Sequence, residues 1–359
     1  VLFLAHAYPR YPGDPVGSFV LRLATALRLE AIDVTVLVPG GPDLPAKDTI
    51  EGIPVVRYRY APRSFETLAY AGTMGAQVRG AWRARIALGG LLAASFAKAR
   101  SLANREGAAL VHAHWWFPGG LAGSWIHRIS GLPLVTTLHG SDIRLAGEFP
   151  GGRSVFRGVA RASSSVTAVS SWLARQASAL EPSVQPIVAP MPVVTDLFHP
   201  GGGLADRLLF VGKLTEQKGL QHLLRALTLM RAKPTVDVVG GGRVDDAHLR
   251  RMAAELGVAD RINWLPLMTQ AELAELYRRA TLHVMPAIDE GLGLTAVESL
   301  LCETPVVAFD SGGVPDIVVN EKTGLLVPPG DAHALAIAID RLLANPHERA
   351  TLGRQGRAH

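Results

Sequence analysis

The sequence is poor in cysteine, in aromatic residues and in long hydrophobic runs. One cysteine, Cys302, occurs in 359 residues, which excludes an internal disulfide and is typical of a reducing compartment. The longest apolar run, 86–97, is shorter than the about 18–20 residues that cross a bilayer. No basic, cleavable leader precedes the first apolar residues, so we expect no secretory signal and a cytoplasmic protein.

The remaining composition is that of an ordinary α/β protein. Hydrophobic residues make up 48% of the chain and charged residues 19%. A chain of this length can form two domains, each with its own core. Short apolar runs alternate with amphipathic stretches, a pattern that predicts parallel sheets with crossover helices. The fold class we predict is α/β, with two doubly wound, Rossmann-like domains.

The expected elements form two series. We predict strands at 1–5, 33–38, 55–58, 110–113, 134–138, 165–168 and 187–189, then at 207–211, 236–239, 262–265, 282–285, 306–309 and 324–327. We predict helices at 19–29, 82–104, 119–130 and 171–179, then at 220–230, 245–256, 270–279, 295–301, 315–319 and 332–344. Proline and glycine between the series indicate a linker. The predicted boundaries are a first domain 1–189, a linker 190–206, a second domain 207–345 and a C-terminal tail 346–359.

The second series contains a loop suited to a phosphorylated ligand. An apolar strand at 282–285 is followed by Glu290 and, eight residues later, by Glu298 on a helix. The residues between them that begin the helix are Gly291, Leu292, Gly293, Leu294 and Thr295. Backbone N–H groups at such a helix start bind anions. Glu298 can accept hydrogen bonds from a ribose diol, and Glu290 can reach what lies beyond the phosphates. The pattern indicates a nucleotide-sugar pocket.

Other glycines of this half also follow predicted strands. Gly212 follows the first strand of the series, Gly240 the second and Gly312 the fifth. In open α/β sheets, ligands bind at the carboxyl ends of the strands. The positions of these loops therefore agree with a ligand site there.

Five motifs together resemble those of the family-4 retaining glycosyltransferases. The stretch 286–298 resembles the E-x7-E signature, and 211–219 resembles the "G-R-L-x-x-x-K-G" element of that family. The stretches 138–142, 240–242 and 312–316 also match, in the order of the family. The resemblance implies a GT-B fold, in which two Rossmann-like domains face each other across a cleft. It also implies transfer of a hexose from a UDP- or GDP-sugar to a hydroxyl of a glycan, lipid-linked or small-molecule acceptor.

The resemblance assigns donor-binding roles to residues of the second domain. Lys213 and Lys218 would bind the diphosphate, and Gly240 and Gly241 would let the nucleotide approach the backbone. The base would rest near Leu265. Glu290 and Lys218 are candidate catalytic residues in a front-face substitution, in which the leaving phosphate helps to deprotonate the acceptor. A double displacement with Glu290 as nucleophile stays open as a minor alternative.

In the first domain, the resemblance assigns four residues. Gly17 would place its backbone against the donor phosphate, and His139 is the third candidate catalytic residue, beside the transferred sugar. Asp142 and His114 would contact the acceptor, although Asp142 could instead cap a helix. His112 and His114 share a strand face, as metal ligands would, but we find no third ligand. We therefore expect no metal and no cofactor besides the nucleotide-sugar donor.

The sequence departs from the family pattern at several places. Lys213 stands where the family usually has Arg, and Pro266 stands where it usually has glycine. Asp316 replaces a glutamate, and 190–194 differs from the usual hinge sequence. The chain also lacks the aromatic helix that usually crosses back to the first domain.

The region 57–105 is strongly basic. It contains nine basic residues and one acidic residue, Glu66, with aromatic residues between them. Such a region is a solvated pair of helices or a surface that contacts anionic lipid on the inner face of the membrane. Nucleic acid is the least favoured partner, because no reading motif accompanies the charge.

Two other classes of function share this fold. One is a GT-B sugar-nucleotide epimerase, and the other is a non-catalytic module that binds a nucleotide sugar. The E-x7-E motif and the order of the hinge and motifs argue against the epimerase. Intact Glu290, Glu298 and Lys218 argue against the module.

Overall fold

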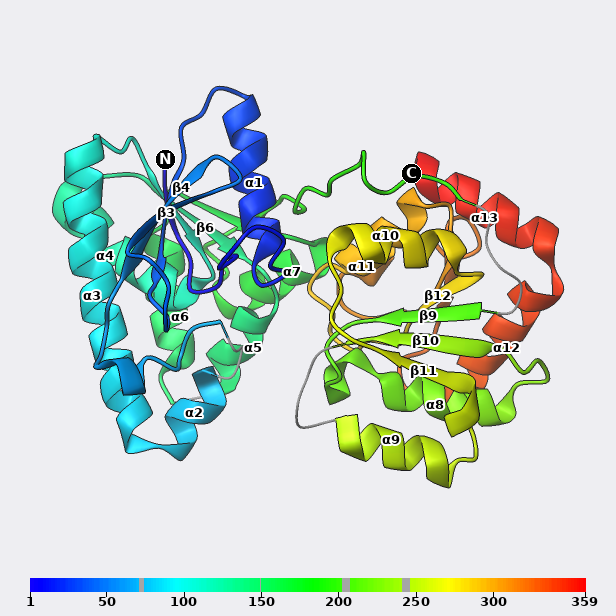
Figure 1. Cartoon of the computed structure of the whole chain (residues 1–359). Coiled ribbons are helices and arrows are strands. Elements are labelled where there is room, and N and C mark those ends of the chain that lie inside the picture. Colours follow the sequence, from blue (N-terminus) through cyan, green and yellow to red (C-terminus); the bar gives the residue numbers. More distant parts are fainter. Residues whose placement is uncertain (71–73, 149, 202–206, 241–245) are drawn as a thin grey trace. The chain divides into compact units, whose positions relative to one another are not determined.

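The computed structural model describes residues 1–70, 74–148, 150–201, 207–240 and 246–359. The chain divides into two compact units, Val1–Pro192 and Val193–His359. Each unit is an α/β fold built on a mainly parallel sheet (Figure 1). The division falls within the residues predicted to form the linker, of which 202–206 lie outside the described residues.

The first unit is built on an eight-stranded sheet with the order β3-β4-β2-β1-β5-β6-β7-β8. Neighbouring strands are parallel except β3 and β4. The strands are β1 (Leu2–Leu4), β2 (Thr35–Pro39), β3 (Lys47–Ile50), β4 (Ile53–Tyr58), β5 (Val111–His114), β6 (Leu134–Leu138), β7 (Ser165–Ala168) and β8 (Ile187–Val188). The α-helices are α1 (Ser18–Leu29), α2 (Met74–Gly80), α3 (Trp82–Glu106), α4 (Leu121–Ser130), α5 (Ser141–Glu148), α6 (Gly152–Ala162) and α7 (Ser171–Leu180).

Both faces of this sheet are covered, so alternate strand residues enter different cores. Phe3 and Val36 pack with Val20 of α1 on one face. Leu2 and Val111 pack on the other face, with residues of α3 and α4. The strands are therefore apolar on both sides, which is why they read as short continuous hydrophobic runs in the sequence. Figure 1 shows α1 and the α3–α4 pair on opposite sides of the strands.

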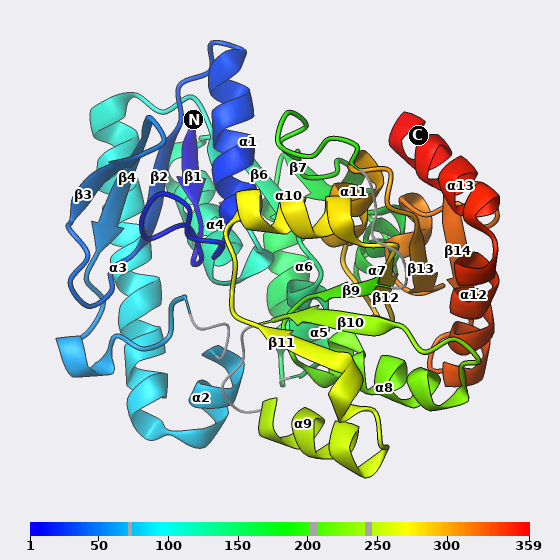
Figure 2. The ribbon, with the colours of Figure 1, turned by 45° about the vertical axis from the view of Figure 1, so that its right-hand side comes forward.

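The second unit is built on a six-stranded parallel sheet with the order β11-β10-β9-β12-β13-β14. The strands are β9 (Arg207–Val211), β10 (Thr235–Val239), β11 (Ile262–Leu265), β12 (Leu282–Met285), β13 (Val306–Phe309) and β14 (Gly324–Val327). The α-helices are α8 (Leu220–Leu229), α9 (Asp246–Glu255), α10 (Gln270–Arg279), α11 (Leu294–Leu301), α12 (Ala332–Ala344) and α13 (Pro346–Ala358). Figure 2 shows α8 and α9 on one side of β9–β11 and α10 on the other.

The two faces of this sheet also have separate cores. Leu208 and Phe210 of β9 pack on the side of α8, α9 and α12. Leu209, between them, packs with Tyr277 of α10 on the opposite side. Phe198, from the segment that follows the division, is fully buried in this second cluster. The segment after Pro192 is thus anchored on the second unit.

The fold differs from the predicted elements at several points. The antiparallel strand β3 and the helices α2, α5 and α6 were not predicted. The expected helix 315–319 is a short 3-10 turn, Val314–Asp316. The predicted tail, 346–359, is helix α13, whose Gly353 and Gly356 lie against Glu303 and Leu300. Leu352 of α13 is buried in the core of the unit, but the neighbouring close contacts use glycine, so the hydrophobic pattern of α13 is weak.

Helix α3 corrects the prediction that no stretch is long enough to cross a bilayer. Within the described part of the chain, it is the one helix that by length and composition could cross a membrane. One face of α3, including Leu91, Ala99 and Ala103, is buried in the core of the first unit, and 28% of its most apolar 18-residue window is buried. These contacts are those of a helix that packs one face on a sheet.

Candidate active site

The candidate donor site begins at the switch point of the second sheet. Chain order runs outward from β9 to β10 and β11 on one side, and from β12 to β13 and β14 on the other. At such a switch point, the loops after the two central strands part and leave a crevice for a ligand. Lys218 follows β9 and Glu290 follows β12. The topology thus brings together two residues that are 72 positions apart.

Hydrogen bonds join the loops that carry these residues. The Ile288 N–H donates to the Gln217 carbonyl at 2.8 Å, and the Gln217 side chain donates to the Asp289 carbonyl at 3.1 Å. The Asp289 N–H donates to the Ser311 hydroxyl at 2.9 Å. The loops after β9, β12 and β13 therefore form one hydrogen-bonded layer at the carboxyl ends of the strands.

Lys218 and Glu290 form an ion pair within this layer. The Lys218 Nζ donates to Glu290 Oε2, and both side chains are partly buried, with 28% and 14% of their surface exposed. Lys213 lies nearby and has an exposed side chain. Surrounding protein atoms and then the charge of Lys218 lower the pKa of Lys213 below its ordinary value. Two ammonium groups and one carboxylate thus lie close together in this layer, with Glu216 and Asp289 on the same loops.

Two glycines allow the loops to come this close. Gly219 has φ +77°, and a Cβ there would collide with the Pro286 carbonyl. Gly312 has φ +64°, and a Cβ there would collide with the backbone of Glu290. Both positions require glycine for the backbone conformation and for the close approach. Glycine thus fixes the positions of the two loops around Glu290.

Helix α11 starts at the end of the same loop. Its N-cap is Gly293 in the left-handed conformation, with φ 96°, so the first turn contains Leu294 and Thr295. Gly291 and Leu292 are buried, whereas Leu294 and Thr295 are partly exposed. The exposed helix start is suited to an anion, because its first N–H groups have no partner within the helix.

Glu298 lies one turn into α11 and is buried, with 4% of its surface exposed. The Tyr277 hydroxyl donates to Glu298 Oε2 at 3.2 Å. Burial, and then the charge of Glu298, raise the pKa of Tyr277 well above its ordinary value. The carboxylate predicted to accept from a ribose thus already has a protein donor. Tyr277 was not predicted as a site residue, because nothing in the sequence places α10 beside α11.

The structure gives Gly240 a packing role. A Cβ at Gly240 would collide with the Gly212 carbonyl and with the Leu214 side chain, so the turns after β9 and β10 touch through bare backbone. The predicted approach of a nucleotide is not tested by this contact. Gly241, predicted to bind the donor with Gly240, lies outside the described residues.

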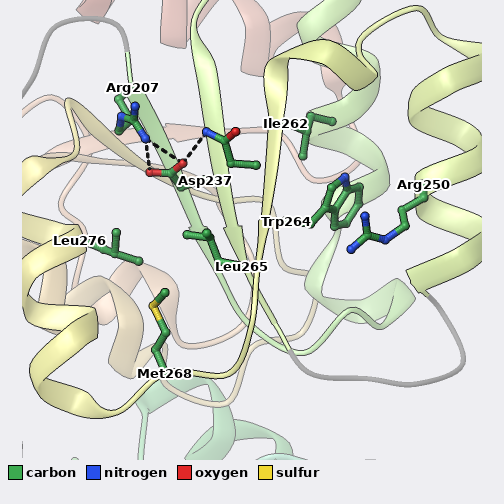
Figure 3. Close-up of a pocket in the computed structure, with 9 residues that line it drawn as sticks. Arg207, Asp237, Arg250, Ile262, Trp264, Leu265, Met268 and Leu276 are labelled. Atoms are coloured by element: carbon green, nitrogen blue, oxygen red, sulfur yellow. Dashed lines mark hydrogen bonds and ion pairs between the residues drawn. The ribbon is translucent and has the colours of Figure 1, made fainter.

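Leu265, predicted to lie near the base, borders a shallow hollow of about 610 Å³. Met268 and Leu276 form its apolar wall, and Asp237 lies between Arg207 and Asn263, bonding the guanidinium at 2.8 Å and the amide at 2.9 Å (Figure 3). Arg207 opens β9, at the end opposite to the loops around Glu290. The hollow therefore extends along the sheet face away from the candidate phosphate site.

In the first unit, Gly17 was predicted to place its backbone against the donor phosphate, and its observed contacts are with the protein's own backbone. It is the N-cap of α1, with φ 66°. A Cβ there would lie 2.6 Å from the Ala7 carbonyl carbon and 2.7 Å from the Tyr8 nitrogen. The loop after β1 is therefore packed against the start of α1, and only glycine fits at the junction.

His139 follows β6 and is surrounded by rings. Trp115 lies 4.7 Å and Phe19 5.0 Å from its ring centroid. Its Nε2 is 3.1 Å from Nδ1 of His114. Burial, followed by the charges of neighbouring histidines, lowers the pKa of His139 to about 3. The imidazole is therefore neutral at physiological pH.

The structure buries Asp142 and His114, the two residues that were predicted to contact the acceptor. Asp142 is 2% exposed, and its carboxylate accepts from the backbone N–H groups of His139, Gly140 and Ile143 at 2.8–3.3 Å. His114 is 0% exposed. The predicted acceptor contacts are not tested by this burial. Asp142 stabilises the turn between β6 and α5, a role that resembles the capping alternative.

Burial and bonding oppose each other at Asp142. Burial raises the pKa of its carboxyl to about 6, although the backbone N–H donors act in the opposite direction.

His112, whose ring stacks on His114, forms a hydrogen bond of 2.6 Å between its Nε2 and Thr137 Oγ1. Among the described residues there is no group of three or more potential ligands that could hold a metal ion.

Comparisons with known proteins agree with this geometry. The family model "Glycosyltransferase Family 4" matches residues 16–196, and the model "Glycosyl transferases group 1" matches residues 205–359. Two similar curated relatives are the D-inositol 3-phosphate glycosyltransferase of Frankia alni, 35% identical, and the GDP-mannose-dependent alpha-(1-6)-phosphatidylinositol monomannoside mannosyltransferase of Mycolicibacterium smegmatis, 33% identical. These alignments cover 69% and 67% of this chain, and 69% and 70% of the relatives.

Similar solved structures show the same fold. The sucrose-phosphate synthase of Thermosynechococcus elongatus has a TM-score of 0.80 and 24% identity, with 99% of this chain and 92% of that chain covered. Anabaena HepE in complex with UDP-glucose has a TM-score of 0.75 and 20% identity, with 99% and 93% covered.

The fold is that of the GT-B glycosyltransferases. The chain belongs to glycosyltransferase family 4, with a group 1 second domain. It spans about two thirds of the length of the curated relatives it matches.

Proposed function

We propose that the protein is a retaining hexosyltransferase, which transfers a hexose from a UDP- or GDP-sugar to a hydroxyl. The observation that carries this proposal is the Lys218–Glu290 pair at the switch point of the second sheet. The ammonium provides a partner for a diphosphate, and the carboxylate beside it provides an acceptor for hydroxyls of the sugar. The partly exposed start of α11 offers further backbone N–H donors to the diphosphate.

The chemistry we propose places the developing negative charge beside two lysines and a helix start. The bond between the anomeric carbon and the diphosphate oxygen breaks, and its electron pair goes to the diphosphate. Lys213, Lys218 and the start of α11 stabilise that charge. The acceptor oxygen bonds to the anomeric carbon from the same face, and its proton goes to the departing phosphate. Glu290 binds the sugar in this scheme and forms no covalent bond.

A diphosphate bound by lysines and helix N–H groups needs no divalent cation to neutralise it. We therefore propose that transfer is independent of metal. EDTA should leave the rate unchanged in protein freed of metal, whereas a rate restored only by Mg²⁺ or Mn²⁺ would contradict this.

For the acceptor we propose a polyol or a lipid-linked polyol. Two relatives are named for action on inositol 3-phosphate and on a phosphatidylinositol monomannoside. Identities of 33–35% favour the same broad class of acceptor without fixing the individual compound.

A donor panel tests the function. The protein is incubated with UDP-glucose, UDP-N-acetylglucosamine or GDP-mannose, with inositol phosphates or phosphatidylinositol as acceptors. Acceptor-dependent release of nucleoside diphosphate supports the proposal, and an α-linkage formed from an α-linked donor, read by NMR, supports retention. An isomerised donor would identify an epimerase. Binding without turnover would identify a non-catalytic module.

We also propose that the start of α3 contacts anionic membrane surfaces, from a cytoplasmic location. Trp82 is 62% exposed and Ile86 is 59% exposed, one turn apart on the helix. Arg83 lies against the Trp82 ring at 5.6 Å, and Arg85 is exposed beside it. An exposed Trp and Ile flanked by arginines is suited to the interface of an anionic bilayer.

Liposome sedimentation tests this contact. The protein should pellet with phosphatidylglycerol vesicles at low salt and less at high salt. Trp82→Ala with Ile86→Ala should reduce pelleting, whereas Leu229→Ala, which removes an exposed leucine of the second unit, should not. Equal pelleting with neutral phosphatidylcholine would contradict the electrostatic part.

A further inference from the structure

The buried histidine behind His139 determines where that residue carries its proton. His114 Nδ1 lies 3.1 Å from His139 Nε2, so one of the two nitrogens donates and the other accepts. His114 is fully buried between Phe3 and the stacked ring of His112, with centroids at 4.8 Å and 4.6 Å. Burial lowers the pKa of His114 well below its ordinary value. Its ring is therefore neutral and has a single N–H.

The surroundings of His114 Nε2 show which of the two ring nitrogens of His114 carries the proton. His114 Nε2 is buried and has no hydrogen-bond partner. If the proton were on Nε2, a buried N–H would lack an acceptor, an arrangement that is rare and costly in proteins. If the proton is on Nδ1, only a lone pair lacks a partner, which is less costly. The second arrangement is favoured, so His114 Nδ1–H donates to His139 Nε2.

We propose that His114 is a positioning residue that holds His139 in the tautomer with its proton on Nδ1. This inference rests on the proposed function, in which His139 lies beside the transferred sugar. Because Nε2 of His139 accepts from His114, the nitrogen left for a ligand is Nδ1–H, a donor. His139 then offers a fixed, neutral hydrogen bond to an oxygen of the donor sugar.

The same geometry excludes an acid–base role for His139. Its Nε2 is occupied by His114, and its Nδ1 already has a proton, so it cannot accept a proton from the acceptor hydroxyl. The low pKa of about 3 agrees, because the imidazolium does not form at neutral pH. His114 thereby has a function that needs no contact with the acceptor. This role suits a fully buried side chain that lies directly behind His139.

The network behind His114 keeps its ring in place. His112 stacks on it with an interplanar angle of 20° and bonds Thr137, whose hydroxyl is 2.7 Å from that of Thr167. Three adjacent strands, β5, β6 and β7, contribute to this chain. The orientation of His139 is thus set by the sheet rather than by its own loop.

The tautomer is measured directly by long-range 1H–15N correlation on protein labelled with 15N-histidine. The His139 signals are those lost in His139→Gln. We expect the unprotonated nitrogen of His139 to be Nε2. Finding the proton on Nε2 in the wild-type protein would overturn the proposal. This readout needs no substrate, so it stands even if no donor in the panel is turned over.

Two variants of His114 separate positioning from packing. His114→Asn keeps an amide close to the place of Nδ1 and should preserve the tautomer, with kcat reduced by no more than about threefold. His114→Leu removes the donor, so His139 should populate both tautomers and kcat for the active donor should fall by about tenfold with KM unchanged. A single Nδ1–H tautomer and full kcat in His114→Leu would contradict the proposal. Circular dichroism shows whether each variant folds. If His114→Leu does not fold, the tautomer of His139 in the wild-type protein and in His114→Asn tests the proposal.

Discussion

At the scale of single residues, the charged pair Lys218 and Glu290 is the feature on which the proposed site depends. The two side chains form an ion pair with each other, and each has a proposed ligand partner of its own. A diphosphate would compete for the ammonium, while sugar hydroxyls would compete for the carboxylate. The two residues should therefore fail in different ways when they are replaced.

Lys218→Met should weaken the binding of UDP and GDP. A hydrogen bond from an ammonium to phosphate contributes about 1.5–3 kcal/mol, so Kd should rise by roughly 10- to 100-fold. Isothermal titration calorimetry measures this, with Lys322→Met, at an exposed lysine of the same unit, as the matched control. An unchanged Kd in Lys218→Met would remove Lys218 from the phosphate site.

Glu290→Gln and Glu298→Gln should affect different kinetic constants. Glu290→Gln should lower kcat by about 100-fold, as expected for a group that acts mainly in the transition state. Glu298→Gln should mainly raise KM for the donor. The two variants are compared by initial rates over a range of donor concentrations. Wild-type constants in both would show that the site is wrongly assigned.

At the scale of elements, the candidate site is a set of loops held together by glycine. The turn from the strand β9 to α8 touches the loop after β12 at Gly219, so the two loops cannot move independently. The left-handed conformation alone costs a non-glycine residue about 1–2 kcal/mol. At Gly219, the collision of an added Cβ with the Pro286 carbonyl increases that cost.

Gly219→Ala should therefore be more harmful than Gly330→Ala. Gly330 has a similar φ of +81°, but nothing lies within 4 Å of a Cβ there. We expect Gly330→Ala to lower the free energy of unfolding by about 1–2 kcal/mol, and Gly219→Ala to lower it further and to weaken binding of UDP and GDP. Urea unfolding and calorimetry measure both. Equal losses in the two variants would mean that the contact with Pro286 is unimportant.

At the scale of the whole molecule, four histidines of the first unit titrate differently in the folded and the unfolded chain. Burial lowers the pKa of His6 and His112 to about 4, of His139 to about 3, and of His114 well below 6.5. In the unfolded chain, these groups would bind protons near pH 6.5. The unfolded state thus binds more protons between about pH 6.5 and 4, and stability decreases as the pH falls through that range.

Asp142 acts in the opposite direction, because its pKa is raised from 3.8 to about 6. The folded state binds its proton first, so this single group gains stability as the pH falls. The effect of four histidines on the pH dependence of stability is larger than that of one aspartate.

The first unit contains five of the six tryptophans: Trp82, Trp115, Trp116, Trp125 and Trp172. Their fluorescence therefore reports mainly on that unit.

Urea unfolding followed by tryptophan fluorescence should show a lower midpoint at about pH 5 than at about pH 7.5. His6→Asn should make this pH dependence shallower, because it removes one buried titrating ring. His347→Asn, at an exposed position of α13, is the control and should leave the dependence unchanged. A midpoint that is constant or rises toward pH 5 would contradict the assignment of buried neutral histidines.

Much of the fold could be predicted because its cause is local. Alternation of apolar strands and amphipathic helices specifies a doubly wound α/β unit whatever the neighbours are. Glycine and charged residues just after strands mark the loops where a ligand binds, because parallel strands all end at one edge. This reasoning predicted from the chain that Lys218, Glu290 and the start of α11 lie at one edge of the sheet, and the structure places them there.

Helix α13 shows where local reasoning stops. Leu352 is buried in the core of the second unit, but the neighbouring close contacts of the helix are made by Gly353 and Gly356. Glycines give no hydrophobic periodicity, so the residues read as a tail. The helices α5 and α6 were also missed; α5 contains Gly147, and α6 contains Gly152 and Gly158, which lower helix propensity. Tertiary packing offsets this low propensity.

The amino-acid sequence specifies which residue types follow which strands, and hence the class of fold and the edge of the sheet where we propose that ligand binds. Only the tertiary structure decided which of those side chains face outward. Asp142 turned inward to the N–H groups of its own turn, and His114 lies beneath His139. The physical reason is that burial depends on neighbours from distant strands, whereas chemical type and strand position are properties of the chain.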